Sequence, residues 1–208
     1  MQIDFMTASQ RDAIAAPMFR ESLGPLGLAE ITPRRWIDGS KPPVRRLFEL
    51  GVGKTGDISL RWGFSLDFVP HLSGDSIRWH RSDKSARLDV TINPKKLPTI
   101  WCPRSEQFRE EFPTLLSKAV AAAKKDWKQG STYQGMLQLI REIRKRNSNW
   151  LPYGMYPQAL LAFAFLNAKT GNLKVAEREL DRFLDPGGLN QAAAAKLKKL
   201  LRETAGPA

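Results

Sequence analysis

Apolar and polar positions alternate over much of the first hundred residues. In residues 57–69 every even position from 58 to 68 is apolar, and this strict period of two is typical of a β-strand with one buried face. The apolar set is Ile58, Leu60, Trp62, Phe64, Leu66 and Phe68. Residues 86–92 repeat the pattern, and weaker segments predict strands at 31–37, 44–50 and 77–80. The connections are too short for parallel crossovers, so we expect an antiparallel meander.

A helix is predicted ahead of these strands. Thr7 and Gln10 have the spacing of a capping box, and a glycine–proline pair ends the helix after about Leu23. Pro17 lies inside the segment and lacks a backbone N–H, so we expect a kink or a break there. The apolar positions of this helix fall on one side. We therefore expect the helix to pack on the apolar face of the sheet.

The period changes after a proline-rich connector at residues 93–103. Beyond it the apolar residues recur at helical spacing, which predicts a series of amphipathic helices. Their apolar positions run from Phe108 to Trp127, Tyr133 to Ile143, Pro157 to about Lys169, Leu173 to Leu184 and Leu189 to Leu200. The predicted fold class is α+β. Residues 1–100 form a helix packed on an antiparallel β-meander, and residues 101–208 form an all-helical domain.

The segment 157–186 resembles a tetratricopeptide-type helical hairpin. Ala164 is the small residue of the first helix, Gly171 belongs to the turn, and Ala176 lies one turn into the second helix. Small residues at these places let the two helices approach closely. The segment departs from the family at Asn167, where an aromatic residue is usual, and its closing proline comes early. The resemblance implies close helix packing and, as in the family, binding of another protein.

The first half of the chain is faintly similar to an uncharacterised bacterial domain family. Three of the short stretches that carry this similarity are Leu26-Gly27-Leu28, Arg35-Trp36-Ile37 and Leu47-Phe48-Glu49-Leu50. A fourth is Trp62-Gly63-Phe64-Ser65-Leu66. The similarity implies no activity and no cofactor.

The composition is that of a globular protein. Of the 208 residues 42% are hydrophobic, with six Trp and ten Phe, enough apolar material to build a core. The longest apolar run, at 159–166, is far shorter than the roughly 20 residues that span a bilayer. Asp4 stands where a secretory signal would carry basic residues. We therefore expect a cytoplasmic protein that has no contact with a membrane.

The net charge is +12, and most of the excess lies in the helical half. Such a charge attracts an acidic protein or a polyanion. The candidate polyanion-binding residues are Lys124, Lys125, Lys128, Arg141, Arg144 and Lys145. The last helix adds Lys196, Lys198, Lys199 and Arg202. If these faces converge on one groove they form a phosphate track, with Trp127 or Trp150 available to stack on bases. If they diverge they are solvated helix surfaces.

The polar face of the predicted sheet is a second candidate site. It carries Arg61, Asp67, Arg87 and Asp89, with His71 and His80 near strand ends. Carboxylates on neighbouring strands can hold a divalent metal or perform acid–base chemistry, so Asp67, Asp89 and His80 define a possible hydrolase site. No strand supplies the acid–x–Lys triplet of metal-dependent nucleases. The favoured interpretation is a solvated sheet face with cross-strand ion pairs.

Two further features predict no chemistry. The run Gly51-Val52-Gly53-Lys54-Thr55 looks like the end of a phosphate-binding loop, but Phe48 stands where the motif needs glycine. A strand also follows where the phosphate-binding helix would begin, so a hairpin turn is favoured. Cys102 is the only cysteine and can form neither an internal disulfide nor a cysteine-based zinc site.

The sequence favours a non-catalytic protein-binding or adaptor protein, with another protein as its partner. This hypothesis depends on the helical hairpin and on the lack of a catalytic motif. The first alternative is a nucleic-acid-binding protein that uses the basic helix faces of the second half. The second is a metal-dependent hydrolase on the polar sheet face. We expect no bound cofactor and no resident metal.

Overall fold

The computed structural model describes residues 6–38, 43–53, 56–92, 97, 99–100, 104–148, 155–185 and 190–205. Most of the proline-rich connector therefore lies outside the described residues, together with Asp4, Cys102, Trp150 and the Lys54-Thr55 pair. The proline that closes the hairpin resemblance, Pro186, lies outside them too.

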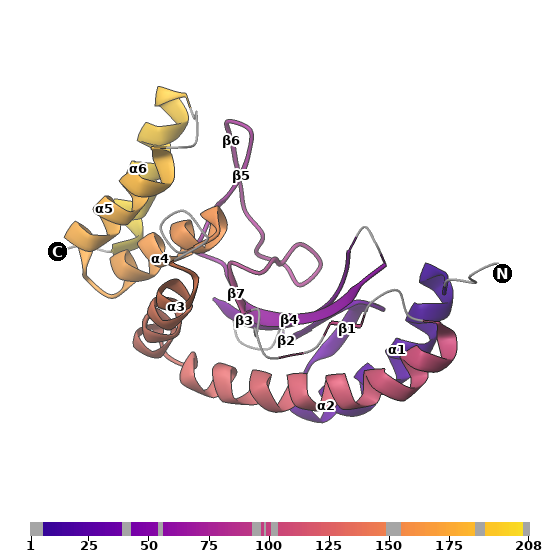
Figure 1. Cartoon of the computed structure of the whole chain (residues 1–208). Helices are drawn as coiled ribbons and strands as arrows, with labels where there is room; N and C mark the ends of the chain where they lie inside the picture. The colour runs from indigo at the N-terminus through magenta and orange to yellow at the C-terminus, as the bar shows by residue number, and fades with distance from the viewer. Residues whose placement is uncertain are drawn as a thin grey trace.

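The chain has the predicted α+β class (Figure 1). Helix α1 (Ala8–Leu23) and a 3-10 turn, η1 (Gly24–Leu26), precede a five-stranded antiparallel sheet of order β1-β2-β3-β4-β7. Its strands are β1 (Ala29–Thr32), β2 (Arg35–Asp38), β3 (Val44–Val52), β4 (Ile58–Leu66) and β7 (Val90–Ile92). Strands β5 (His71–Ser73) and β6 (Ser76–Arg78) form a separate hairpin. The helices that follow are α2 (Ser105–Gln129), α3 (Tyr133–Asn147), α4 (Pro157–Lys169), α5 (Leu173–Leu184) and α6 (Gln191–Ala205).

Helix α1 begins as predicted but is not interrupted. Thr7 and Gln10 form the reciprocal capping box, which satisfies two backbone N–H groups at the helix start. Pro17 lies within the helix, which continues for six residues to Leu23. Phe19 is buried beyond the proline, with its ring against those of Trp36, Phe48 and Phe112. This aromatic packing stabilises the last turns and offsets the backbone hydrogen bond that the proline cannot form.

Two predicted strands differ from the observed ones. Residues 31–37 were expected to form one strand, but the chain turns at residues 33–34 and forms the antiparallel pair β1 and β2. Pro33 has a fixed φ and no N–H, which suits the turn and not the middle of a strand. The strand expected at 86–92 is limited to β7, and residues 86–88 belong to the loop that precedes it.

Helices α1 and α2 cover one face of the sheet, called the first face here (Figure 1). Its core includes Phe48 and Trp62, whose rings stack at 5.9 Å, and Trp127 of α2, whose ring lies edge-on to Phe48. Two indole hydrogen bonds tie α2 to β4. Trp62 Nε1 donates to Asp126 Oδ2 at 2.9 Å, and Trp127 Nε1 donates to the Gly63 carbonyl at 3.1 Å. One continuous apolar core thus contains residues from both halves of the chain.

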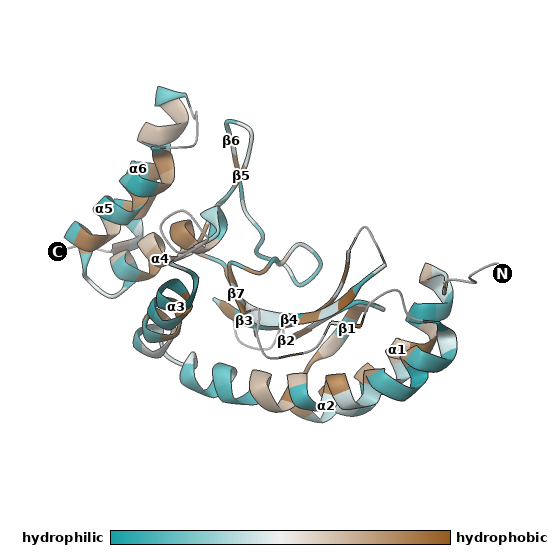
Figure 2. Ribbon diagram, viewed as in Figure 1, coloured by the Kyte–Doolittle hydropathy of each residue, from teal (hydrophilic) through white to brown (hydrophobic). Residues whose placement is uncertain are grey.

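Helix α4 is the central helix of the second half and contacts α3, α5 and α6. Its residues from Leu160 to Ala168 are all buried, whereas α3 is mostly hydrophilic in the view of Figure 2. Helices α4 and α5 pack closely, with Ala164 and Ala176 fully buried and a turn at Gly171 whose φ is +80°. Among the described residues, none of the helices combines the length and the apolar character that a bilayer span requires.

Candidate functional site

A pocket of about 770 Å³ opens on the first face, where the start of β3 meets the turn between α2 and α3. Apolar and aromatic side chains form much of its lining, including Leu26, Val44, Phe64, Tyr133 and Met136. Phe64 and Met136 are buried core residues, so this part of the lining is held rigidly by the sheet and by α3. A concave apolar surface of this size can enclose a side chain or a small molecule.

Three cationic side chains also line the pocket, and they are not equivalent. Arg46 is neutralised by Asp38, with Nη2 and Oδ2 at 2.6 Å, and its guanidinium lies 5.4 Å from the centroid of Trp127. Lys124 and Lys128 are exposed and form no ion pair with any residue that the structure describes. The pocket thus combines an apolar lining with two ammonium groups that have no counter-ion among the described residues.

The wall of the pocket is formed by the tight connection between α2 and α3. A Cβ built on Gly130 would lie 2.3 Å from Phe64 Cζ, so the glycine lets this turn approach the sheet. Thr132 caps α3 by accepting a hydrogen bond from the backbone N–H of Gly135 at 3.1 Å. These local contacts fix the position of Lys128 relative to the apolar lining.

The structure brings only part of the predicted basic set to this pocket. Lys124 and Lys128 line it, whereas Lys125 and Lys145 are exposed elsewhere on their helices. Arg144 is directed to the buried Glu179 of α5, with Nη1 and Oε2 at 3.0 Å. Glu179 also pairs with Arg182 at 2.7 Å, so Arg144 helps to hold α3 against α5.

The remaining basic residues are engaged in similar ways. Arg141 lies over the ring of Phe163, 5.9 Å from its centroid. On α6, Lys198 and Arg202 pair with acids of α5 and Lys199 pairs with Glu203, while Lys196 is exposed. Trp127 is only 4% exposed and cannot stack on a base, and Trp150 lies outside the described residues.

The opposite, second face of the sheet was expected to be solvated, and this expectation is wrong for the part around Arg45, whereas Ser59 and Arg61 are exposed as expected. The loop from Trp79 to Asp89 folds back over it, and Ala86 packs against Ile37 and Leu47. Leu88 is part of the same small cluster. Two of the polar side chains on this face, Arg35 and Arg45, bond to this loop.

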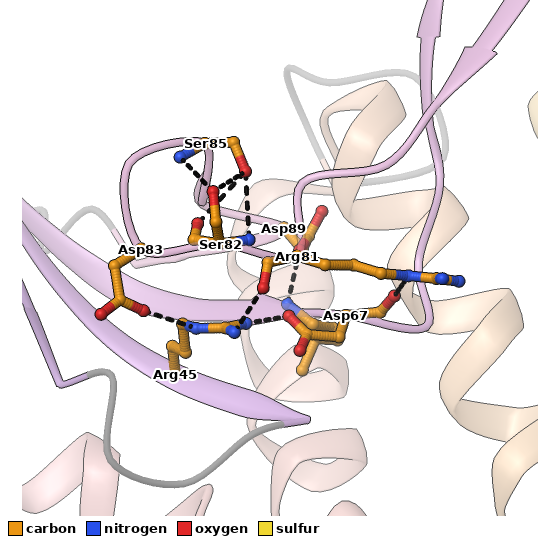
Figure 3. A network of polar contacts seen from close by, with 8 residues as sticks. Arg45, Asp67, Arg81, Ser82, Asp83, Ser85 and Asp89 are labelled. Atoms are coloured by element: carbon orange, nitrogen blue, oxygen red, sulfur yellow. Dashed lines mark hydrogen bonds and ion pairs between the residues drawn. The ribbon is translucent and has the colours of Figure 1, made fainter.

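Arg45 of β3 organises the covered face (Figure 3). Its side chain is only 6% exposed and reaches both Asp67 and Asp83, while its Nη2 donates to the Arg81 carbonyl at 2.6 Å. The adjacent strand positions hold a second ion-pair group, in which Glu49 accepts from Arg35 and from Arg61 at 2.8 Å each. The contacts of Arg45 with Asp83 and with the Arg81 carbonyl anchor the loop to the sheet, whereas Glu49 links three strands of the sheet to one another.

The four predicted sheet-face residues do not form one site. Arg61 binds Glu49, Asp67 binds Arg45, and Arg87 is exposed on the loop. Asp89 is 1% exposed and accepts hydrogen bonds from the Leu66 N–H and from Gln158 Nε2 of α4, both at 2.7 Å. The described residues contain no group of three acidic, histidine or cysteine side chains arranged to hold a metal.

Asp89 also contacts His71, one of the two histidines that the sequence placed only near strand ends. Its Oδ1 lies 2.8 Å from His71 Nε2, and the rings of His71 and His80 meet edge to face with centroids 4.3 Å apart. Burial raises the pKa of the Asp89 carboxyl, and the hydrogen bonds and the charge of His71 act against that rise. Burial, followed by the charges of His71 and Arg87, lowers the pKa of His80 below 6.5.

Comparison with known proteins adds no relative. No protein-family model, curated protein or solved structure matches the chain significantly. The pocket on the first face and the loop over the second face are therefore the features from which a function is inferred.

Proposed function

We propose that this chain is a non-catalytic binding protein of the cytoplasm, and that its partner is another protein. The pocket on the first face would take an apolar side chain from an acidic segment of that partner. The observation that carries the proposal is the pair of ammonium groups, Lys124 and Lys128, which have no acidic partner among the described residues and lie beside an apolar lining. The lining would desolvate an aromatic or aliphatic anchor, and the two lysines would attract the flanking carboxylates.

Acidic protein fits these features better than a nucleic-acid strand does at this place. A phosphate track needs cationic groups repeated along a groove, but Arg144, Lys198 and Arg202 are directed to acids of α5. Phe64 and Trp127 are buried in the lining and offer no exposed face for base stacking. A single apolar pocket with a charged rim is the arrangement that an anchored peptide uses.

The helical hairpin of α4 and α5 is a second element that supports a protein partner. Its resemblance to a tetratricopeptide hairpin implies a role in protein binding, and its buried small residues fit close packing of the two helices. A hydrolase is less well supported. Asp67 is engaged by Arg45, and Asp89 is enclosed by Leu66, His71 and Gln158.

The test is a titration of the full chain with short synthetic peptides. The library varies one central residue between aromatic, aliphatic and polar side chains, and varies the flanks between glutamate and lysine. We expect peptides with an aromatic or aliphatic centre and glutamate flanks to bind with a Kd of about 1–100 μM by calorimetry. The double variant Lys124→Glu/Lys128→Glu should weaken this binding at least about ten-fold, because it replaces attraction by repulsion.

A matched control reverses two other exposed lysines, Lys118→Glu and Lys196→Glu, and leaves the net charge equal to that of the pocket variant. It should bind the peptides within about three-fold of the unaltered chain. Equal losses in the two double variants would show that only overall charge matters and would contradict the proposal. Failure of every peptide in the library to bind would contradict it as well.

A further inference from the structure

A separate concentration of positive charge lies on the loop that covers the second face. Arg78, Arg81, Lys84 and Arg87 are exposed within ten residues of chain, and His80 lies among them. Arg78 ends β6 two residues before His80, and Arg87 lies near the end of the loop; after burial and the charge of His71, the charges of both arginines lower the pKa of the His80 ring. We call Arg78, His80 and Arg87 the His80 cluster.

The acidic residues of this region do not neutralise the cluster. Asp67 and Asp83 are bound by Arg45 beneath the loop, and Asp89 is buried against His71 and the Leu66 N–H. Arg78 and Arg87 form no ion pair with any acidic residue that the structure describes. Positive groups that gather without a counter-ion create a local field that favours an anionic partner.

The loop is also held rigidly, which is what a binding surface needs. Arg45 fixes Arg81 and Asp83 from below, and the Ser82 and Ser85 hydroxyls bond to each other at 2.8 Å (Figure 3). The Arg81 guanidinium lies 4.0 Å from the centroid of the Trp79 ring and donates from Nε to the Asp67 carbonyl at 3.1 Å. The stacked pair of Trp79 and Arg81 presents a flat, cationic surface next to the His80 cluster.

We propose that this loop is a second binding surface, and that it contacts a single-stranded nucleic acid. The backbone phosphates would lie at Arg78 and Arg87, and a base would stack on the pair formed by Trp79 and Arg81. Rigid cationic groups beside a stacking platform are the two components of strand binding that does not depend on sequence. This surface lies on the face of the sheet opposite the pocket, so the inference is independent of the proposed protein partner.

The test uses the full chain and a fluorescein-labelled single-stranded oligonucleotide of about 15 nucleotides, followed by fluorescence anisotropy. We expect binding that weakens steeply between low and physiological salt. The variant Arg78→Glu/Arg87→Glu should bind at least about ten-fold more weakly. The matched control Lys118→Glu/Lys196→Glu changes the net charge by the same amount and should lose less than about three-fold.

A third variant, Trp79→Ala, tests the stacking component at unchanged net charge. It should lower the affinity by about five- to a hundred-fold, as expected for the loss of one stacked base. Equal losses in the two charge-reversal variants would overturn the proposal. So would the absence of salt-dependent binding, or a result in which inorganic phosphate shifts the histidine resonances while the oligonucleotide does not bind. The pocket variant Lys124→Glu/Lys128→Glu should match the control here, which separates this test from that of the proposed protein partner.

Discussion

At the scale of single residues, Gly130 determines the shape of the pocket because it has no Cβ, which lets the α2–α3 turn lie close to Phe64. Phe64 is almost fully buried, so its ring cannot yield to a new methyl group without moving its neighbours. We expect Gly130→Ala to lower the free energy of unfolding by about 1–3 kcal/mol, measured by urea denaturation. The variant should also weaken peptide binding, because the turn that carries Lys128 would shift.

Gly24 provides the matched control. Its φ is −55°, an ordinary helical value, and no atom lies within 4 Å of a Cβ built there. Gly24→Ala should change the free energy of unfolding by less than about 1 kcal/mol, because the lower entropy of the unfolded chain is offset by Pro25, which disfavours helical φ and ψ for a preceding residue with a Cβ. If Gly130→Ala were as well tolerated as Gly24→Ala, the close approach of the turn to Phe64 would not be a constraint.

Arg45 shows which residues could not be found from the sequence. An arginine at a polar position of an alternating strand is expected to be exposed to solvent. The alternation shows which residues are polar, but not whether another segment of the chain covers them. Whether a distant loop folds over that face depends on contacts with Asp83 and Arg81, which lie more than thirty residues along the chain. The alternation of β4 was therefore predicted correctly, but the burial of Arg45 beneath the loop was not predicted.

At the scale of elements, the β5–β6 hairpin connects the sheet to the helical half. Gln158 of α4 reaches the Pro70 carbonyl and Asp89, and Asp75 Oδ1 accepts from the Asn190 N–H at the start of α6 at 3.1 Å. The sequence predicted a strand here but not these long-range contacts, since nothing in a local pattern pairs residues so far apart. His71 and His80 lie in this connection, so their ionisation should affect its stability.

The sign of that effect follows from His80. The pKa of His80 in the folded chain lies below its ordinary value of 6.5, which the unfolded chain keeps. At a pH between these two pKa values the unfolded chain therefore binds more protons than the folded chain. The contribution of His80 to the free energy of unfolding should therefore be fully present above pH 6.5. It should be lost as the pH drops from 6.5 toward the pKa of the folded chain. The pKa of Asp89 is raised above the ordinary value of 3.8, so at a pH above 3.8 the folded chain binds more protons than the unfolded chain. Asp89 therefore makes the free energy of unfolding fall as the pH rises, which is opposite to the effect of His80.

The variant His80→Gln isolates the histidine contribution. Urea denaturation from about pH 5 to about pH 8 should give a flatter dependence for this variant than for the unaltered chain, chiefly below pH 6.5. Identical pH dependences would contradict the assignment of this loss of stability to His80.

At the scale of the whole molecule, the change of apolar period correctly separated the strands from the helices. It did not predict that α2 packs on the sheet. The apolar stripe of an amphipathic helix indicates which face of the helix is buried, but not which element it packs against. Trp62, Phe64 and Trp127 consequently belong to one core and to one pocket shared by both halves. The proposed protein partner and the proposed nucleic acid would then bind on opposite faces of one sheet, as an adaptor requires.

We propose that the partner protein binds in the pocket between β3 and the α2–α3 turn. Amide hydrogen exchange of the full chain, with and without the tightest-binding glutamate-flanked peptide, tests it most directly. We expect slower exchange over residues 43–46 and 130–136, and unchanged exchange over the loop at 78–87. Protection that is confined to α5, α6 or the 78–87 loop, with none around the pocket, would contradict the claim.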